Sequence, residues 1–507
     1  MESAPATEPT AVTIEKPQLK AGAISFVSNI VIAVASVAPA YSLAATLGYI
    51  AAVPLLGYQS PAVVLVAFFP MAFIATAYYY MNRADPDAGT TFAWVTRGMG
   101  PWLGWQGGWA IVVADVLVMP SLADVAGNYS FQLFGVTPTT AEVVAVGIAW
   151  IIVMTAICYI GIELSARTQR ALLTLEFITL IAFAVVALVK VYTSNPAHSV
   201  MPQASWFNPF DIKSFSALNG GILLAIFIYW GWDTGVSVNE ETENPNSTPG
   251  KSAVISTFIL VAIYLLVTTA AQSFGGLHNL VVNQADVLSP LGHGVLGSGL
   301  DKILIIAVLS SASASTQTTI LPTARTTLSM GRAGAIPRQF ANIHPRFLSP
   351  GFSTIWMGTV SMLVYVLLSL TSHDNLIADA FTSLALTIAF YYGITGFACV
   401  LYYRRHLLDS VKNFVMIGVL PFTGGAILTW VLVKAVIVYS APDGGYARPF
   451  LGIGSPIAIA LLTIVLGLIT MVIQRIWMPE FFKTRRAEVV DPAVLARAPA
   501  ATSSRGL

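Results

Sequence analysis

The chain has 507 residues, of which 56% are hydrophobic and only 10% are charged, and its mean hydropathy is +0.75. This composition excludes an ordinary soluble globular protein, and a net charge of +1 argues against nucleic acid as a partner. The two cysteines, Cys158 and Cys399, lie in apolar runs, which indicates packing residues rather than a disulfide or a metal site.

The N-terminal segment, residues 1–20, is polar and contains Pro5, Pro9 and Pro17. It lacks the apolar core of a signal peptide, so we expect a disordered cytoplasmic N-terminus. The apolar runs that follow are each long enough to cross a hydrocarbon core of ~30 Å. They predict an all-α integral membrane protein with twelve transmembrane helices, at 22–53, 60–81, 102–134, 139–161, 167–191, 215–242, 251–274, 301–330, 353–372, 376–403, 413–440 and 453–476.

Basic residues set the expected orientation of these helices. With the N-terminus inside, the 25 Lys and Arg residues fall in inside segments, except Lys190, Lys213, Lys302, Lys434 and Arg448. This asymmetry follows the positive-inside rule and favours an even number of helices. We therefore expect a multi-pass protein of the cell membrane with both termini cytoplasmic.

The first span contains an interruption at SVAPAYS. Pro39 removes one backbone donor and clashes with the preceding turn, and Ser36, Tyr41 and Ser42 flank it. A proline kink is common in membrane helices, so this break gains its meaning from a second break farther along the chain.

The second break lies in the stretch from Phe227 to Pro249, which begins as a membrane helix that cannot continue as one. Gly231 and Gly235 weaken the helix, and Asp233 lies between them, where an ionised carboxylate in hydrocarbon is costly. An interrupted helix with a buried acid near its break is typical of a solute or ion site in a secondary transporter. The alternative is a glycine kink packed against neighbouring helices, with Asp233 paired structurally.

Breaks in spans 1 and 6, five spans apart, indicate an inverted repeat of five plus five helices with two peripheral helices. The expected organisation is a disordered N-terminus (1–20), repeat 1 with helices 1–5 (21–191), an extracellular loop (192–214), repeat 2 with helices 6–10 (215–403), helices 11–12 (404–476) and a cytoplasmic C-terminal tail (477–507).

Four further acids lie in or near the spans. Asp115 falls near mid-membrane in the third span and Asp124 near its outer mouth, and the helical repeat places them on opposite faces. Asp115 is therefore either a site residue or a member of a structural pair, whereas Asp124 is expected to be hydrated. Glu176 is interpreted as a structural residue near a span end, and Asp379, in the outer part of span 10, as a solvated one.

The eighth span carries a run of hydroxyl side chains from Ser310 to Thr319. Ser311 and Ser315 are four residues apart and share a helix face. Either these hydroxyls serve close helix packing, or they supply hard oxygen ligands for an alkali cation, together with carbonyls freed at the first break. In span 10, Tyr391 and Tyr392 either line the inner path or pack.

Three stretches resemble the amino acid–polyamine–organocation (APC) superfamily. PDAGTTFAWVTRGMGPWLGWQGGW (86–109) resembles the family's loop into helix 3, and FIYWGWDTGVSVNEETENPNSTP (227–249) its helix 6 signature. RTTLSMGRAGAIP (325–337) resembles the stretch after helix 8. The likeness extends over about 20–480 and implies the leucine-transporter-type fold of ten helices in an inverted repeat, with uptake or exchange of amino acids or amines.

The resemblance also implies roles for particular residues. Backbone amides at the helix 1 break would meet a substrate carboxylate, and carbonyls of both breaks its amino group. Phe227 matches the aromatic gate, Asp115 and Met119 match the side-chain pocket of arginine-exchanging members, and Asp233 matches an acid proposed for proton coupling or gating. The positions so implied are Ala38, Ala40, Tyr41 and Ser42 for the carboxylate, Val34, Ala35, Trp230 and Gly231 for the amino group, and Ser315 and Thr316, beside Ser311, for a sodium site.

The sequence departs from the family pattern at two places. Many members have a glycine-rich break in helix 1, whereas this chain has Ser36-Val-Ala-Pro-Ala-Tyr41, which puts the carboxylate-binding positions in doubt. The middle of helix 5 (167–189) has no lysine, so a lysine cannot replace sodium there.

These features predict a secondary active transporter of amino acids, cationic ones among them, that works by alternating access. A P-loop and a nucleophile–base arrangement are both missing from the sequence, so neither an ATP-driven pump nor an enzyme is expected. Its partners would be a small-molecule substrate and the lipid bilayer, with no cofactor beyond a coupling H⁺ or Na⁺. A polyamine or organic amine transporter, a passive channel or facilitator, and a transceptor remain alternatives, and symport, exchange and oligomeric state stay open.

Overall fold

The computed structural model describes residues 18–371 and 376–483, so most of the expected N-terminal (1–20) and C-terminal (477–507) segments lie outside the described residues. Within those two ranges the chain is helical and has no β-sheet, although single bridges join Ile24 to Thr242 and Phe450 to Ile453. The predicted all-α class is confirmed.

The first predicted pass consists of two helices, α1 (Phe26–Ser36) and α2 (Pro39–Ala51). Ala38 between them adopts left-handed backbone angles, with φ 50°, and Pro39 begins α2 because its missing N–H is not needed in a first turn. The remaining helices of the first half are α3 (Ser60–Ala84), α4 (Thr91–Met99), α5 (Pro101–Gln132), α6 (Thr140–Ile160) and α7 (Ile162–Ser194).

The second half repeats this plan, beginning with a second interrupted pass. Helix α8 (Phe215–Phe227) is followed by a turn. The pass then continues with α9 (Thr234–Ser237) and the 3₁₀ turn η3 (Asn239–Glu241). The other elements are η1 (Ala204–Phe207), η2 (Pro209–Asp211), α10 (Thr248–Val282), α11 (Leu288–Leu296), α12 (Asp301–Arg332), η4 (Arg338–Ala341), α13 (Gly351–Thr371), α14 (Leu376–Tyr402), α15 (Val411–Asn413), the π-helical turn η6 (Phe414–Val419), α16 (Leu420–Tyr439), α17 (Ser455–Trp477) and α18 (Pro479–Phe482).

Eleven helical segments in the described part of the chain are long and apolar enough to cross a membrane. The interrupted segment from α8 to η3 is the remaining predicted pass, with only α8 apolar over its 13 residues. The bundle has a centre and a rim. In the most apolar stretch of each span, 83% of the residues are buried in α1–α2 and in α12, against 28% in α6, α13 and α17. The two breaks and α12 therefore form the core that lipid does not reach.

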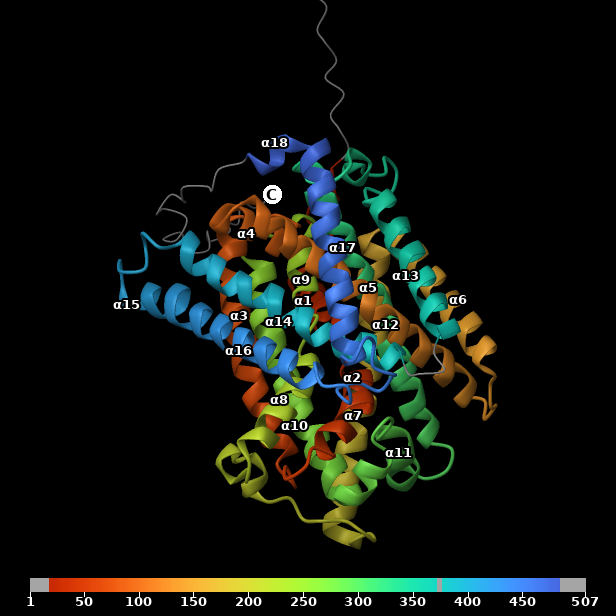
Figure 1. Ribbon diagram of the computed structural model, residues 1–507. Helices are drawn as coiled ribbons and strands as arrows, with labels where there is room; N and C mark the ends of the chain where they lie inside the picture. Colours follow the sequence, from red (N-terminus) through yellow and green to blue (C-terminus); the bar gives the residue numbers. More distant parts are fainter. Residues whose placement is uncertain (1–17, 372–375, 484–507) are drawn as a thin grey trace, which may run out of the picture.

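Figure 1 shows α6 beside α13 at one side of the bundle and α16 at the other, with α5, α12 and α1–α2 between them. Helices α4 and α18 lie at one end of the bundle, and α11 lies at the opposite end. These are called the α4 end and the α11 end below.

Two expectations about the ends of spans are wrong. The seventh span does not end at 274 as expected, because α10 continues to Val282 through a kink at Gly276 (φ 65°), and α11 follows before the eighth span. Asp379 is not solvated either, since its side chain is fully buried. Its carboxylate accepts hydrogen bonds from the N–H groups of Tyr446 and Ala447, at 2.8 and 2.7 Å, and from the Ser455 hydroxyl, and so holds the segment before α17.

Candidate functional site

The two interrupted passes touch at their breaks. A Cβ atom at Gly231 would lie 2.7 Å from the carbonyl oxygen of Ser36, and Gly231 has φ 118°, so only glycine allows this approach. The hydroxyls of Ser36 and Thr234 share a hydrogen bond of 2.7 Å. Asn29 Nδ2 donates to the Gly235 carbonyl at 2.8 Å. The break of the first pass is thereby fixed against the break of the sixth.

Asp233 is held by two tyrosines of α14. Its carboxylate accepts from the hydroxyls of Tyr392, at 2.8 Å, and of Tyr391, at 3.2 Å. The Tyr391 hydroxyl in turn accepts from the indole N–H of Trp230. Tyr391 and Tyr392 therefore do more than pack or line a path. Their hydroxyls orient the Asp233 carboxylate at the helix break.

Asp115 of α5 is buried opposite this acid. Its Oδ2 accepts from the Thr323 hydroxyl at 2.5 Å, and its side chain is 2% exposed. Met119, one turn later, packs in an apolar cluster with Ile32 and Ile320 rather than beside Asp115 on the cavity described next. The structure therefore brings Asp115, but not Met119, to the breaks.

A closed cavity of about 10 Å³ lies between the breaks. Its volume is on the order of a single water molecule's, so it cannot hold an amino acid without a rearrangement. Within the described residues neither Asp115 nor Asp233 forms an ion pair with Lys or Arg. The lining residues are Ser36, Ile111, Asp115, Trp230, Gly231, Asp233, Thr234, Thr319, Pro322 and Tyr391.

Other implied substrate positions are engaged in the backbone around the breaks. The carbonyls of Val34 and Ala35 accept from the N–H groups of Val37 and Ala38, at 3.1 Å each. The Phe227 carbonyl accepts from the Trp230 N–H at 2.9 Å, and the Phe227 ring is 6.4 Å from the Trp230 ring. Phe227 is buried, so in this structure its ring does not stand open to solvent.

Glu176 was missed by the sequence interpretation. It lies in the middle of α7, which starts at Ile162 rather than at 167, and its side chain is fully buried. Its Oε1 accepts from the Ala40 N–H at 2.7 Å and from the Ser311 hydroxyl at 2.9 Å. The expected place near a span end, within reach of water, is wrong. A longer estimate of the fifth helix would have placed this carboxylate at the depth of the first break.

The hydroxyl run of α12 reaches the first break at two positions. Ser311 Oγ accepts from the Tyr41 N–H at 3.2 Å, and Ser315 Oγ donates to the Ser36 carbonyl at 3.1 Å. Thr316 donates instead to the Ala312 carbonyl of its own helix, at 2.9 Å. Ser311 and Ser315 therefore join α12 to the break, whereas the hydroxyl of Thr316 is used within α12.

At the α4 end, ion pairs close the bundle. Arg325 of α12 donates to both oxygens of Glu241, at 2.6 and 2.9 Å, and the side chains are 2% and 1% exposed. Arg332 pairs with Glu240 nearer the surface, at 2.8 Å. The partners of the two pairs are 84 and 92 residues apart in the chain, so only the folded structure brings them together.

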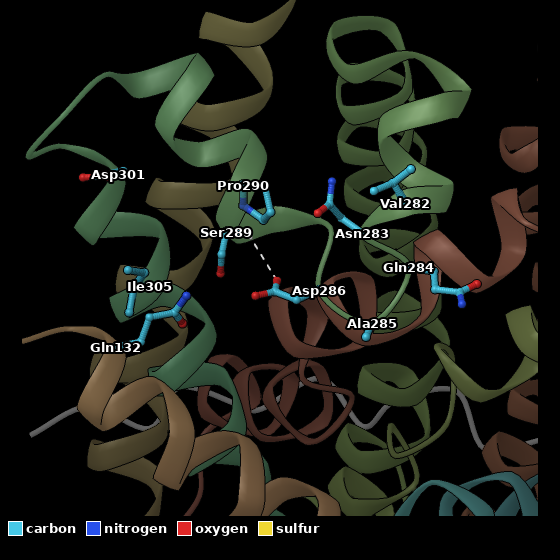
Figure 2. Close-up of a pocket in the computed structure, with 10 residues that line it drawn as sticks. All are labelled: Gln132, Val282, Asn283, Gln284, Ala285, Asp286, Ser289, Pro290, Asp301 and Ile305. Atoms are coloured by element: carbon cyan, nitrogen blue, oxygen red, sulfur yellow. Dashed lines mark hydrogen bonds between the residues drawn. The ribbon is translucent and has the colours of Figure 1, made fainter. Parts of the chain in front are cut away.

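At the α11 end lies a wider cavity of about 680 Å³. Figure 2 shows Asp286, which accepts from the Ser289 N–H at 3.2 Å, and Asp301 on the far wall. Gln132, Asn283 and Gln284 are further polar side chains at this cavity. Its ten lining residues include two carboxylates and no lysine or arginine, which gives this mouth an acidic character.

The fold and the site define a multi-pass membrane protein whose first and sixth passes break around buried acids. The chain belongs to the amino acid permease family, whose sequence model matches residues 24–469. The resemblance to the APC superfamily is thus confirmed.

Three relatives illustrate the range of this family. The chain is similar to an uncharacterized transporter of Mycobacterium tuberculosis, with 27% identity over 278 residues, and spans 54% of its own length and 58% of that relative. It is 24% identical to the branched-chain amino acid permease of Bacillus subtilis over 390 residues, which is 72% of this chain and 77% of the permease. It is 20% identical to the low-affinity putrescine importer of Escherichia coli over 370 residues, 72% and 78% of the two chains.

Proposed function

We propose that this protein is a secondary active transporter that moves amino acids or related organic amines, with a preference for cationic ones, across the cell membrane. Family membership supports transport of this broad class. The names of relatives cover branched-chain amino acids, cationic amino acids and putrescine, so they do not choose among substrates. The proposed orientation keeps both termini cytoplasmic, as the distribution of basic residues favours.

One observation carries the cationic preference. Asp115 and Asp233 line the same closed cavity, and no Lys or Arg within the described chain is paired with either carboxylate. Buried carboxylates are normally compensated by a cation, and opposite charges attract more strongly in a poorly solvated site than in water. A cationic group of the substrate supplies the missing charge. In this scheme Asp115 distinguishes substrates, and Asp233 is the gating or proton-accepting acid.

The closed state of the cavity supports alternating access. A volume of about 10 Å³ excludes any amino acid, so binding requires the surrounding helices to separate toward one face. The segments that would move are interrupted, and glycines at the sixth break allow the backbone to change direction. The Glu241–Arg325 pair closes the α4 end, whereas the acidic cavity lies toward the α11 end.

Uptake into proteoliposomes tests this function. We expect accumulation of labelled lysine or arginine against a concentration gradient, and a loss of about tenfold or more for Asp115→Asn with cationic substrates only. Equal losses for cationic and neutral substrates would show that Asp115 does not recognise charge. Equilibration without uphill accumulation would instead indicate a passive facilitator.

Coupling is a separate part of the proposal. Asp233, with two tyrosine donors, is our candidate for a proton site, and Ser311 with Ser315 at the first break is the alternative for sodium. Collapse of the proton gradient should abolish uphill uptake if Asp233 couples transport. Uptake that persists without a proton gradient and stops without sodium would assign coupling to the α12 hydroxyls.

A further inference from the structure

The N-terminus of α2 is the position at which a substrate carboxylate would be expected to bind. The first amides of a helix have no partner within the helix, and together with the helix dipole they attract anions. Helix α2 has 13 residues and begins at Pro39, which has no N–H. The amides available to a ligand are therefore those of Ala40 and Tyr41, since the next amide, that of Ser42, makes the first hydrogen bond of the helix.

All three amides already have partners inside the protein. Ala40 donates to the Glu176 carboxylate at 2.7 Å, Tyr41 donates to the Ser311 hydroxyl at 3.2 Å, and Ser42 donates to the Ala38 carbonyl at 2.8 Å. The anion at this helix terminus is thus a side chain of the chain itself. An amino acid could bind its carboxylate here only after displacing Glu176.

Glu176 is held at the α2 N-terminus by burial and by hydrogen bonds. Its side chain is fully buried, and Ser311 donates to the same oxygen, Oε1, that Ala40 does, at 2.9 Å. Its second oxygen, Oε2, has no hydrogen-bond partner, and Glu176 is in none of the ion pairs that Lys and Arg form within 18–371 and 376–483. A buried carboxylate with one unsatisfied oxygen favours a nearby cation and disfavours a second carboxylate.

The residues and helix ends around Glu176 also favour a positively charged group. Ser36, four residues before Ala40, lines the cavity that also holds Asp115 and Asp233. The carbonyl ends of α1 and α8 point to the same region, and helix C-termini carry partial negative charge. The wider cavity at the α11 end is lined by two more carboxylates, Asp286 and Asp301, of which Asp301 pairs with His293 at 3.0 Å (Figure 2). The residues that line the cavity at the breaks thus include two carboxylates and no basic side chain, which favours a positively charged group there.

We propose that Glu176 takes the place of a substrate carboxylate at the α2 N-terminus, so that the transported solute is an organic amine without an α-carboxylate. This inference rests on the proposed transport function and narrows its substrate class to monoamines and diamines. Glu176 is a specificity-determining residue in this scheme. It satisfies the amide that an amino acid would use, and its charge repels the carboxylate of a zwitterion.

Paired probes that differ only in the carboxylate test the inference. Cadaverine is lysine without its carboxylate, and isopentylamine is leucine without its own. We expect the full-length protein in proteoliposomes to prefer each amine over its amino acid by about tenfold or more, the effect of one charge-assisted hydrogen bond.

Substitutions at Glu176 should change this ratio in a graded way. Glu176→Ala frees the Ala40 amide and should lower the amine preference by about tenfold or more. Glu176→Gln keeps an acceptor for that amide but removes the charge, so its ratio should fall between the two. Glu163→Gln is the matched control, because Glu163 lies on the same helix, is 48% exposed and pairs with Lys20, and its ratio should equal that of the unmodified protein.

The possible results separate this inference from the proposed function. Uptake of lysine or leucine in preference to the matching amine overturns the inference alone, as does an amine preference that survives both Glu176 substitutions. If Glu176→Ala does not fold, the ratio in the unmodified protein and in Glu176→Gln decides. Failure to take up any of the four probes overturns the transport function together with the inference.

Discussion

The buried ion pair between Arg325 and Glu241 gives the most direct test of the forces that hold the α4 end together. The two side chains are 2% and 1% exposed and share hydrogen bonds of 2.6 and 2.9 Å. Arg325→Met leaves the Glu241 carboxylate buried without a cation, and Glu241→Leu leaves the guanidinium without an anion. Breaking a buried pair in this way costs about 3–5 kcal/mol of unfolding free energy.

The double variant should behave differently from the two single ones. Glu241→Leu with Arg325→Met removes both charges at once, and replacing a buried pair by apolar side chains is often neutral or stabilising. We therefore expect the double variant to lie within about 1–2 kcal/mol of the unmodified protein. The coupling energy is the change in unfolding free energy of the double variant minus the sum of the changes in the two single variants. It should be about 3 kcal/mol or more, with a sign opposite to the changes in the single variants.

Unfolding in mixed micelles with an increasing fraction of denaturing detergent provides the free energies. Glu163→Gln is the control, because the Lys20–Glu163 pair also joins opposite charges, at 2.8 Å, but is 48% exposed on both sides. Its loss should stay below about 1 kcal/mol. The reasoning is refuted if the single variants at the buried pair lose no more than this control, or if their effects simply add in the double variant.

Three other predictions concern the sixth break, the loop before α17 and the α3–α4 turn. Gly231→Ala places a Cβ 2.7 Å from a carbonyl of α1 and should abolish uptake, whereas Gly135→Ala, also at positive φ but with open space around it, should not. Asp379→Ala leaves the buried N–H of Ala447 and the partly buried N–H of Tyr446 unpaired, at about 1–3 kcal/mol for the buried group, and limited proteolysis should cleave 440–454 faster than in the Asp443→Ala control. Burial raises the pKa of Asp87 above its ordinary 3.8, so the folded state keeps a proton that the unfolded chain has released. The free energy of unfolding should therefore fall as the pH rises from 3.8 through the raised pKa of Asp87. Asp87→Asn should remove this pH dependence of stability, and an unchanged pH dependence in that variant would contradict the raised pKa.

The amino-acid sequence by itself determined the helices and the places where two of them break. Apolar runs of membrane length are a property of consecutive residues, so all twelve predicted passes correspond to helical segments of the structure. Pro39 at the first break, and Gly231 beside Asp233 at the second, change backbone geometry locally. Both breaks could therefore be located without knowledge of any neighbour.

Tertiary structure alone decided which polar groups meet inside the bundle. Ala40 and Glu176 are 136 residues apart, Glu241 and Arg325 are 84 apart, and Asp379 is 68 residues from Ala447. The burial of such a group depends on helices brought together from distant parts of the chain, and no local pattern records it. For this reason the sequence placed Glu176 near a span end and Asp379 in a solvated position, whereas the structure places both side chains in the interior.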